Sequence, residues 1–222
     1  MKEHLRTIKN NILDLFFPLD EQCMLCEKEE KLDAPYLCKT CLSKLEEMPF
    51  SHNREIPVYK QVISGYLLNE TAKKIIYKHK YGHKRYMSHV LAHLLAEKIV
   101  EEGLEFEVIT SIPSGKKRNR MRGCDHAYDI AVELGHIVKK PVRRMLKRVH
   151  HESTQSELSK LERYGNMADA FKLINGTITE TEILVIDDIY TTGATMEAAA
   201  RLLSSEDRKL IGATVFYTPI QK

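Results

Sequence analysis

The stretch from Ile183 to Thr195 constrains the fold more than any other part of the sequence. Four apolar residues, Ile183–Ile186, are followed by the adjacent acids Asp187 and Asp188 and then by a short hydroxyl-rich loop with one glycine. An apolar run of this kind predicts a strand in the middle of a parallel sheet, buried on both faces. We expect the strand to end at the acids, which places them at the edge where open α/β sheets bind ligands.

The rest of the chain beyond residue 57 alternates between strand and helix periodicity. Strands are expected over 58–68, 106–112, 182–186 and 209–218, and helices over 71–77, 86–101, 125–138 and 195–203. Strands that alternate with helices predict a mostly parallel sheet flanked by helices. The fold class is therefore α/β.

A smaller domain is expected before this sheet. Apolar residues at helical spacing predict an amphipathic first helix that ends before Pro18: Leu5, Ile8, Ile12, Leu15 and Phe16. Packing on its own protein is the simplest role for this helix, and a membrane-surface or partner-facing helix is the alternative. The stretch from Met48 to Pro57 contains two prolines and several polar residues, which indicates a boundary. We expect one domain over residues 1–52 and a second over residues 53–222.

Composition and charge restrict the possible ligands of the protein and its cellular compartment. The net charge of +3, from 34 Lys and Arg against 31 Asp and Glu, is too small to identify a nucleic-acid binder by itself. No apolar run is long enough for a membrane-spanning helix, and the first residues, Met1 to Arg6, do not resemble a signal peptide. We therefore expect the protein in the cytoplasm, where thiols stay reduced.

Four cysteines form two closely spaced pairs. Cys23 and Cys26, and likewise Cys38 and Cys41, are each separated by two residues, and eleven residues lie between the pairs. Two such pairs can surround Zn²⁺ with four thiolates and leave no open position, which predicts a small structural zinc module with four cysteine ligands in the first domain. Two disulfides and an iron–sulfur cluster are the alternatives, and the cytoplasmic setting favours zinc. Cys124 is left over and is expected to be a buried or incidental thiol.

The loop after the two acids is suited to a phosphate monoester. The first turn of a helix presents unpaired N–H groups and a partial positive charge. Gly193 lets the backbone approach the phosphate oxygens, and Thr191, Thr192 and Thr195 add hydroxyl donors. The acids would repel a phosphate but can accept hydrogen bonds from sugar hydroxyls, with Mg²⁺ nearby to offset their charge.

Two alternatives to a sugar-phosphate site fit these residues less well. The apolar strand and its acids would also suit a Walker B strand of an ATPase, but this needs a GxxxxGK[ST] loop. Around Gly115-Lys116, Thr110 stands where the first glycine of that loop belongs. A plain helix cap that binds nothing is the second alternative, and two adjacent carboxylates before a Thr-Thr-Gly turn are an odd way to build one.

Residues 183–195 resemble the motif with which type I phosphoribosyltransferases bind phosphoribosyl pyrophosphate (PRPP). The resemblance implies a type I phosphoribosyltransferase-like sheet, in which Asp187 and Asp188 hold the ribose hydroxyls of PRPP or a related sugar phosphate, with Mg²⁺. It also implies that the 5-phosphate is held by the loop residues Thr191, Thr192, Gly193, Ala194 and Thr195.

A basic region follows the strand that ends at Ile112. From Lys116 to Arg148 there are eleven Lys or Arg residues against three acids. The candidates for holding a pyrophosphate or a nucleic-acid backbone are Ser114, Lys116, Lys117, Arg118, Arg120 and Arg122. A merely solvated basic face is the alternative. The polar stretch 147–159 is long for a connection and predicts a mobile lid.

The order of these parts resembles the ComF family of bacterial late-competence proteins. Further matching residues are Lys80-Tyr81-Gly82, Arg122-Gly123, Thr154-Gln155, Leu158-Ser159, Arg163 and Asn166. Cys124, Asp125 and His126 depart from the aromatic residue, Asn and Gln that usually follow Arg-Gly in the family. The resemblance implies a role in natural transformation. The protein would handle incoming single-stranded DNA in the cytoplasm, at the inner face of the membrane, with a helicase-like partner and a recombination mediator.

Two functions stay open at this point. The first is a PRPP-binding module of DNA uptake, in which Tyr77, Tyr81 and Tyr86 are candidates for stacking on bases. The alternative is an active phosphoribosyltransferase that transfers phosphoribosyl from PRPP to a nucleobase-like acceptor, with basic residues stabilising the leaving pyrophosphate. Thr191 stands where resembling enzymes that act on 6-oxopurines carry an Asp, and threonine is no base at neutral pH. No catalytic residue is therefore predicted.

Overall fold

The computed structural model describes residues 22–34, 36–45, 56, 58–81, 86–114, 125–149, 170–174 and 176–218. The chain divides into two compact units, Met1–Leu45 and Glu46–Lys222. The predicted boundary between residues 52 and 53 lies in a segment outside the described residues and stays a prediction. The helix expected before Pro18 and the lid expected over 147–159 also lie outside them, apart from residues 147–149.

In the first unit, the part of the chain that the structure describes (residues 22–34 and 36–45) contains three short elements. Strands β1 (Leu32–Ala34) and β2 (Leu37–Cys38) pair antiparallel, and helix α2 (Lys39–Leu42) follows directly. A turn precedes them, in which the amide of Glu27 donates to the carbonyl of Cys23 at 2.8 Å. A unit of this size has little apolar surface to bury, so it needs a further source of stability.

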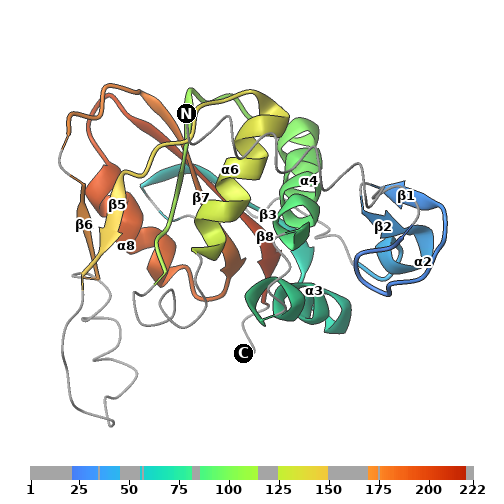
Figure 1. The fold of residues 1–222 in the computed structure, drawn as a ribbon. Coiled ribbons are helices and arrows are strands. Elements are labelled where there is room, and N and C mark those ends of the chain that lie inside the picture. Colours follow the sequence, from blue (N-terminus) through green and yellow to red (C-terminus); the bar gives the residue numbers. More distant parts are fainter. Residues whose placement is uncertain are drawn as a thin grey trace, which may run out of the picture. The chain divides into compact units, whose positions relative to one another are not determined.

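The second unit is organised by a four-stranded sheet in the order β3-β8-β7-β4 (Figure 1). Its strands are β3 (Tyr59–Leu67), β4 (Val108–Ser111), β7 (Glu182–Tyr190) and β8 (Lys209–Tyr217), and all neighbours run parallel. Outside this sheet, β5 (Leu146–Arg148) and β6 (Phe171–Leu173) form a separate antiparallel pair.

Among the described residues of the second unit, four helices connect and cover the strands. They are α3 (Glu70–Tyr81), α4 (Tyr86–Glu101), α6 (His126–Val138) and α8 (Ala194–Leu203). Helices α4 and α6 pack side by side and contact the sheet, whereas α8 packs against β8 and β6 (Figure 1). The predicted α/β class, a parallel sheet with flanking helices, is therefore confirmed.

Strand β7 shows why the sheet needs helices on both faces. Its residues Ile183, Leu184, Val185 and Ile186 are all fully buried. Ile183 and Val185 belong to the apolar cluster that includes residues of α8. Because side chains alternate along a strand, Leu184 and Ile186 point to the opposite face. The apolar run thus fills both cores, as its unbroken hydrophobic pattern predicts.

The observed elements differ from the predicted ones mainly at their ends. Helix α4 has the predicted bounds, and α3 is longer than the predicted 71–77. Strand β7 continues four residues beyond Ile186, so its predicted end there is wrong. The β5–β6 pair was not predicted, because three-residue strands give no periodic signal. Within the described residues, no helix is both long enough and apolar enough to cross a bilayer.

Candidate functional site

The predicted acid pair lies at the carboxyl edge of the sheet, beyond the end of one neighbouring strand. Strand β4 pairs with β7 only as far as Ser111 opposite Ile186. Strand β8 continues to pair with β7 as far as Tyr190. Asp187 and Asp188 are therefore held in register by β8 while β4 has already ended beside them. Pairing with β8 gives the two acids a rigid backbone, and no strand in the described part of the chain pairs with them on the β4 side.

Asp188 is paired with a lysine from α3. The ammonium of Lys80 contacts the Asp188 carboxylate, and the two side chains are only 21% and 15% exposed. The amide of Asp188 also donates to the Asp187 carboxylate at 2.9 Å. A partly buried ion pair is screened less by solvent than a surface pair, so it fixes the end of α3 against the end of β7.

Asp187 lies in a more enclosed environment. Burial, together with the neighbouring Asp188 carboxylate, raises the pKa of Asp187 well above its usual value. Asp187 in turn adds to the effect of burial in raising the pKa of Tyr59. The Tyr59 hydroxyl donates to the carbonyl of Met196 in α8 at 3.0 Å. Lys80 is thus paired with Asp188, and its charge also acts on Asp187.

The Thr-Gly loop joins the acids to the first turn of α8. Gly193 is the residue before the helix and has a left-handed backbone conformation, with φ of +82°. Its carbonyl accepts the first helical hydrogen bond, from the amide of Glu197 at 2.8 Å. Thr191 and Thr192 are exposed, whereas Ala194 and Thr195 are half-buried. The loop thus presents exposed hydroxyls next to a helix N-terminus, and its role in binding phosphate stays a prediction.

Ser114 is tied to a buried acid that the sequence did not single out as a site residue. Asp125, 8% exposed, accepts a hydrogen bond from the Ser114 hydroxyl at 3.4 Å and from the Arg144 guanidinium at 3.0 Å. Arg144 also stacks over the ring of Tyr128, 3.4 Å from its centroid. Asp125 stands where the chain departs from the family pattern, and it links the end of β4 to α6. The predicted basic residues Lys116, Lys117, Arg118, Arg120 and Arg122 lie outside the described residues.

Two histidines join α3 to the start of α6. The rings of His79 and His126 meet edge to face with 4.7 Å between their centroids. His79 is 6% exposed, and burial, with a smaller effect of His126, lowers its pKa to about 4. His79 is therefore neutral at physiological pH, and its two ring nitrogens make no hydrogen bond to the described residues. No sequence motif marks this pair, because the two residues meet only through the packing of the helices.

The four predicted cysteine ligands come together in the first unit. The sulfur atoms of Cys23, Cys26, Cys38 and Cys41 all lie within 4.8 Å of one another, and Cys26 and Cys38 are 3.8 Å apart. A tetrahedral zinc site with Zn–S bonds of about 2.3 Å has sulfurs about 3.8 Å apart. Burial and the neighbouring thiols raise the pKa of Cys41, and a bound cation would relieve that effect. The cluster can therefore hold a metal ion such as zinc.

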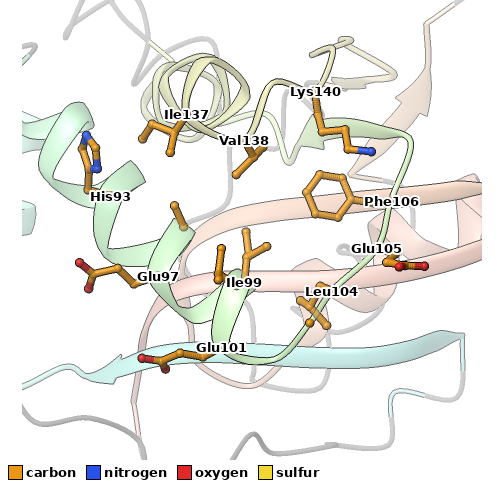
Figure 2. A pocket seen from close by; sticks show the side chains of 13 residues that line it. His93, Glu97, Ile99, Glu101, Leu104, Glu105, Phe106, Ile137, Val138 and Lys140 are labelled. Carbon is orange, nitrogen blue, oxygen red and sulfur yellow. The ribbon is translucent and has the colours of Figure 1, made fainter.

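A groove on the second unit lies away from this edge. It is lined by the end of α4, the segment that leads into β4 and the end of α6, including Val100, Leu104, Phe106 and Val138 (Figure 2). In a parallel sheet with crossover helices, the ends of helices and the starts of strands lie at the amino edge. None of the predicted site residues that the structure describes lines this groove.

The described residues of the second unit form an α/β fold with a four-stranded parallel sheet and flanking helices. No protein-family model matches the chain. Similar solved structures include a glutamine PRPP amidotransferase from Bacillus subtilis, 14% identical with a TM-score of 0.42 over 63% of this chain and 30% of that chain. They also include an adenine phosphoribosyltransferase, 15% identical with a TM-score of 0.40 over 65% of this chain and 74% of that chain. Likenesses this low carry no inference about activity.

The chain is also similar to two curated relatives, and both are competence proteins. The chain is 27% identical over 182 residues to competence protein ComFC of Bacillus subtilis (strain 168), covering 82% of this chain and 70% of the relative. It is 30% identical over 100 residues to competence protein F of Haemophilus influenzae, covering 44% of each. The chain thus spans less than half of the second relative and less than a third of the amidotransferase. The predicted resemblance to the ComF family is thus confirmed, since the chain is similar to two competence proteins of that name.

Proposed function

We propose that this ComF-type protein binds PRPP at the carboxyl edge of its sheet and handles incoming single-stranded DNA in the cytoplasm during natural transformation. One observation carries the first half of the proposal. The acid pair, held by β8 beyond the end of β4, runs directly into a left-handed Gly193 and the N-terminus of α8. Two carboxylates that could accept hydrogen bonds from a sugar and a helix N-terminus that suits a phosphate thus belong to one short stretch, residues 187–195.

Each part of the ligand has a matching part of this edge. The 5-phosphate fits the first turn of α8, where the aligned peptide dipoles and the Thr191 and Thr192 hydroxyls favour an anion. The ribose hydroxyls fit the carboxylates of Asp187 and Asp188, which accept hydrogen bonds. These oxygens also suit Mg²⁺, which would offset the charge of the pyrophosphate.

Replacing both acids by their amides is expected to weaken PRPP binding by at least about a hundredfold. Each amide keeps one acceptor oxygen, but the double variant Asp187→Asn/Asp188→Asn replaces one carboxylate oxygen per residue by an N–H donor and removes both negative charges. The charge-assisted contacts to the sugar hydroxyls and Mg²⁺ are therefore weakened, by about a factor of ten for each acid. Calorimetry with PRPP and Mg²⁺ measures the effect. The exposed Asp207 lies in a turn and serves as control, so Asp207→Asn should bind like the wild type. Equal heats from the double variant and the wild type would refute the pocket.

An assay of pyrophosphate release on the same protein samples distinguishes a PRPP-binding module from an active transferase. Pyrophosphate released from PRPP in the presence of a nucleobase, and lost in the double variant, would establish the transferase alternative. Binding of PRPP without release would leave a binding module.

Helix α3 supports the second half of the proposal. Tyr77 and Tyr81 are 65% and 53% exposed, and their ring centroids lie 5.0 Å apart. Large exposed aromatic rings are unusual on a folded surface and provide a stacking platform for bases. The exposed Lys74 on the same helix adds positive charge for the phosphate backbone, whereas Lys73 is paired with Glu70. Tyr86, the third candidate, is half-buried and therefore less suited to stacking.

Removing both exposed rings is expected to weaken single-stranded DNA binding by about thirtyfold or more, because each of the two stacked bases contributes about 1–3 kcal/mol. The double variant Tyr77→Ala/Tyr81→Ala is compared with the wild type by fluorescence anisotropy on a labelled oligonucleotide. Val100→Ala is the control, because Val100 is exposed but lies at the other edge of the sheet.

A separate variant with Lys116, Lys117 and Arg118 changed to Gln should make binding less dependent on salt. Unchanged affinity in both variants would argue against direct DNA binding.

We also propose that the four-cysteine cluster binds Zn²⁺ in a structural role. Four thiolates fill a tetrahedral shell, so no position is left for substrate. The short elements around the cluster supply little core of their own, and the metal would supply the stability that they lack.

A further inference from the structure

The ion pair between Lys80 and Asp188 occupies part of the site that the proposed ligand needs. The ammonium contacts one of the two Asp188 carboxylate oxygens, and both side chains are largely removed from solvent. A ribose hydroxyl that donates to this carboxylate must share it with the ammonium. A divalent cation beside the same acid would lie close to a positive charge, which is unfavourable. Binding of a Mg²⁺-bound sugar phosphate is therefore in competition with Lys80.

The position of Lys80 is fixed by its own helix. His79, the preceding residue, is buried against His126 at the start of α6. The end of α3 is thus held at the junction of α6 and β7, and the Lys80 side chain extends from there to Asp188. A lysine side chain is a flexible four-carbon stem with a single charged group, so the ammonium can change partner while the helix stays in place.

We propose that Lys80 is the internal counter-ion of the acid pair, and that its ammonium moves from Asp188 to the pyrophosphate of PRPP when the sugar binds. This inference rests on the proposed PRPP site. Before binding, Lys80 neutralises one of two adjacent carboxylates. The ligand brings its own Mg²⁺ to the acids and presents a highly charged pyrophosphate, so exchange of partners keeps every charge paired. Lys80 is then a positioning residue for the sugar and a direct ligand of the pyrophosphate.

Comparison of two ligands tests this role, because ribose 5-phosphate has the sugar and the 5-phosphate but no pyrophosphate. For Lys80→Gln we expect the Kd for PRPP with Mg²⁺ to rise about tenfold or more, since a charge-assisted contact is lost. The Kd for ribose 5-phosphate should stay the same or fall, because no ion pair has to be broken. Lys80→Arg keeps the charge and should recover most of the PRPP affinity.

The controls separate this role from a structural one. Lys172→Gln removes an exposed lysine of β6, to which no binding role is assigned, and should leave both Kd values unchanged. If Lys80→Gln weakens both ligands equally, Lys80 only supports the fold of the site, and the proposed exchange is wrong. If it changes neither Kd, the ion pair is irrelevant to binding, which also overturns the inference. If the wild type binds neither ligand, the PRPP site itself is refuted, and the inference falls with it.

Discussion

Gly193→Ala is expected to lower the free energy of unfolding by about 3 kcal/mol and to weaken PRPP binding more than tenfold. Gly193 has φ of +82°, which costs an alanine about 1–2 kcal/mol. An added Cβ would also lie 2.9 Å from the ring carbon Cζ of Tyr190, and nearer still to its hydroxyl oxygen. Tyr190 is 4% exposed and packs against Tyr217, so its ring has little room to move. The loop must shift instead, and the N-terminus of α8 shifts with it. Thermal denaturation and calorimetry with PRPP measure the two effects.

Gly103 provides the matched control for this substitution. It also has a positive φ, of +59°, but no atom lies within 4 Å of the position of its missing Cβ. Gly103→Ala therefore carries only the backbone cost and lies away from the acids, next to the amino-edge groove. It should cost about 1 kcal/mol, which is about 2–4 °C in Tm for a domain of this size, and leave PRPP binding intact. Equal effects of the two substitutions would show that the contact with Tyr190 is unimportant.

Cys41→Ser is expected to reduce bound zinc from one ion per chain to nearly none and to unfold the first unit. The apparent binding free energy of structural zinc is about 10–16 kcal/mol, more than three thiolates and such short elements can replace. The second unit has its own sheet and core, so it should stay folded. Metal analysis of the purified protein gives the stoichiometry, and limited proteolysis shows which unit becomes accessible.

Cys124→Ser is the control for the zinc prediction, because Cys124 is the fifth cysteine and stands outside the two CxxC pairs. Its zinc content should equal that of the wild type. Iron in place of zinc, or full zinc retention in Cys41→Ser, would contradict the proposed metal site.

The sequence was sufficient for features that depend on local pattern. The bounds of α4 follow from its apolar periodicity, and the burial of Ile183–Ile186 follows from an unbroken apolar run. The spacing of the two CxxC pairs was sufficient to predict that the four cysteines lie close together, because this spacing is typical of a shared metal site. These signals are contained in short windows of the chain, where propensity and periodicity decide the outcome.

Local sequence patterns could not predict contacts between segments that are far apart in the chain. Lys80 and Asp188 are far apart in the sequence, and only the packing of α3 near the end of β7 brings them together. The sequence did not predict the contact between Asp125 and Arg144, because Arg144 follows α6 in the chain and Asp125 precedes it. The predicted end of β7 at Ile186 was wrong because its two neighbouring strands stop pairing with it at different positions. On the β4 side its pairing stops at Ile186, as the acids indicate, but β8 prolongs the strand on the other side.

The antiparallel β5–β6 pair has a consequence for variation in chain length. Leu146 lies opposite Leu173, Arg148 lies opposite Phe171, and the amide of Val149 donates to the carbonyl of Ala170 at 2.8 Å. This ladder clamps the two ends of the chain between residues 149 and 170 next to each other. Doubling the length of a clamped connection costs only about 0.6 kcal/mol of closure entropy. Insertions between these residues, whether inherited or engineered, should therefore leave the sheet and its carboxyl edge undisturbed.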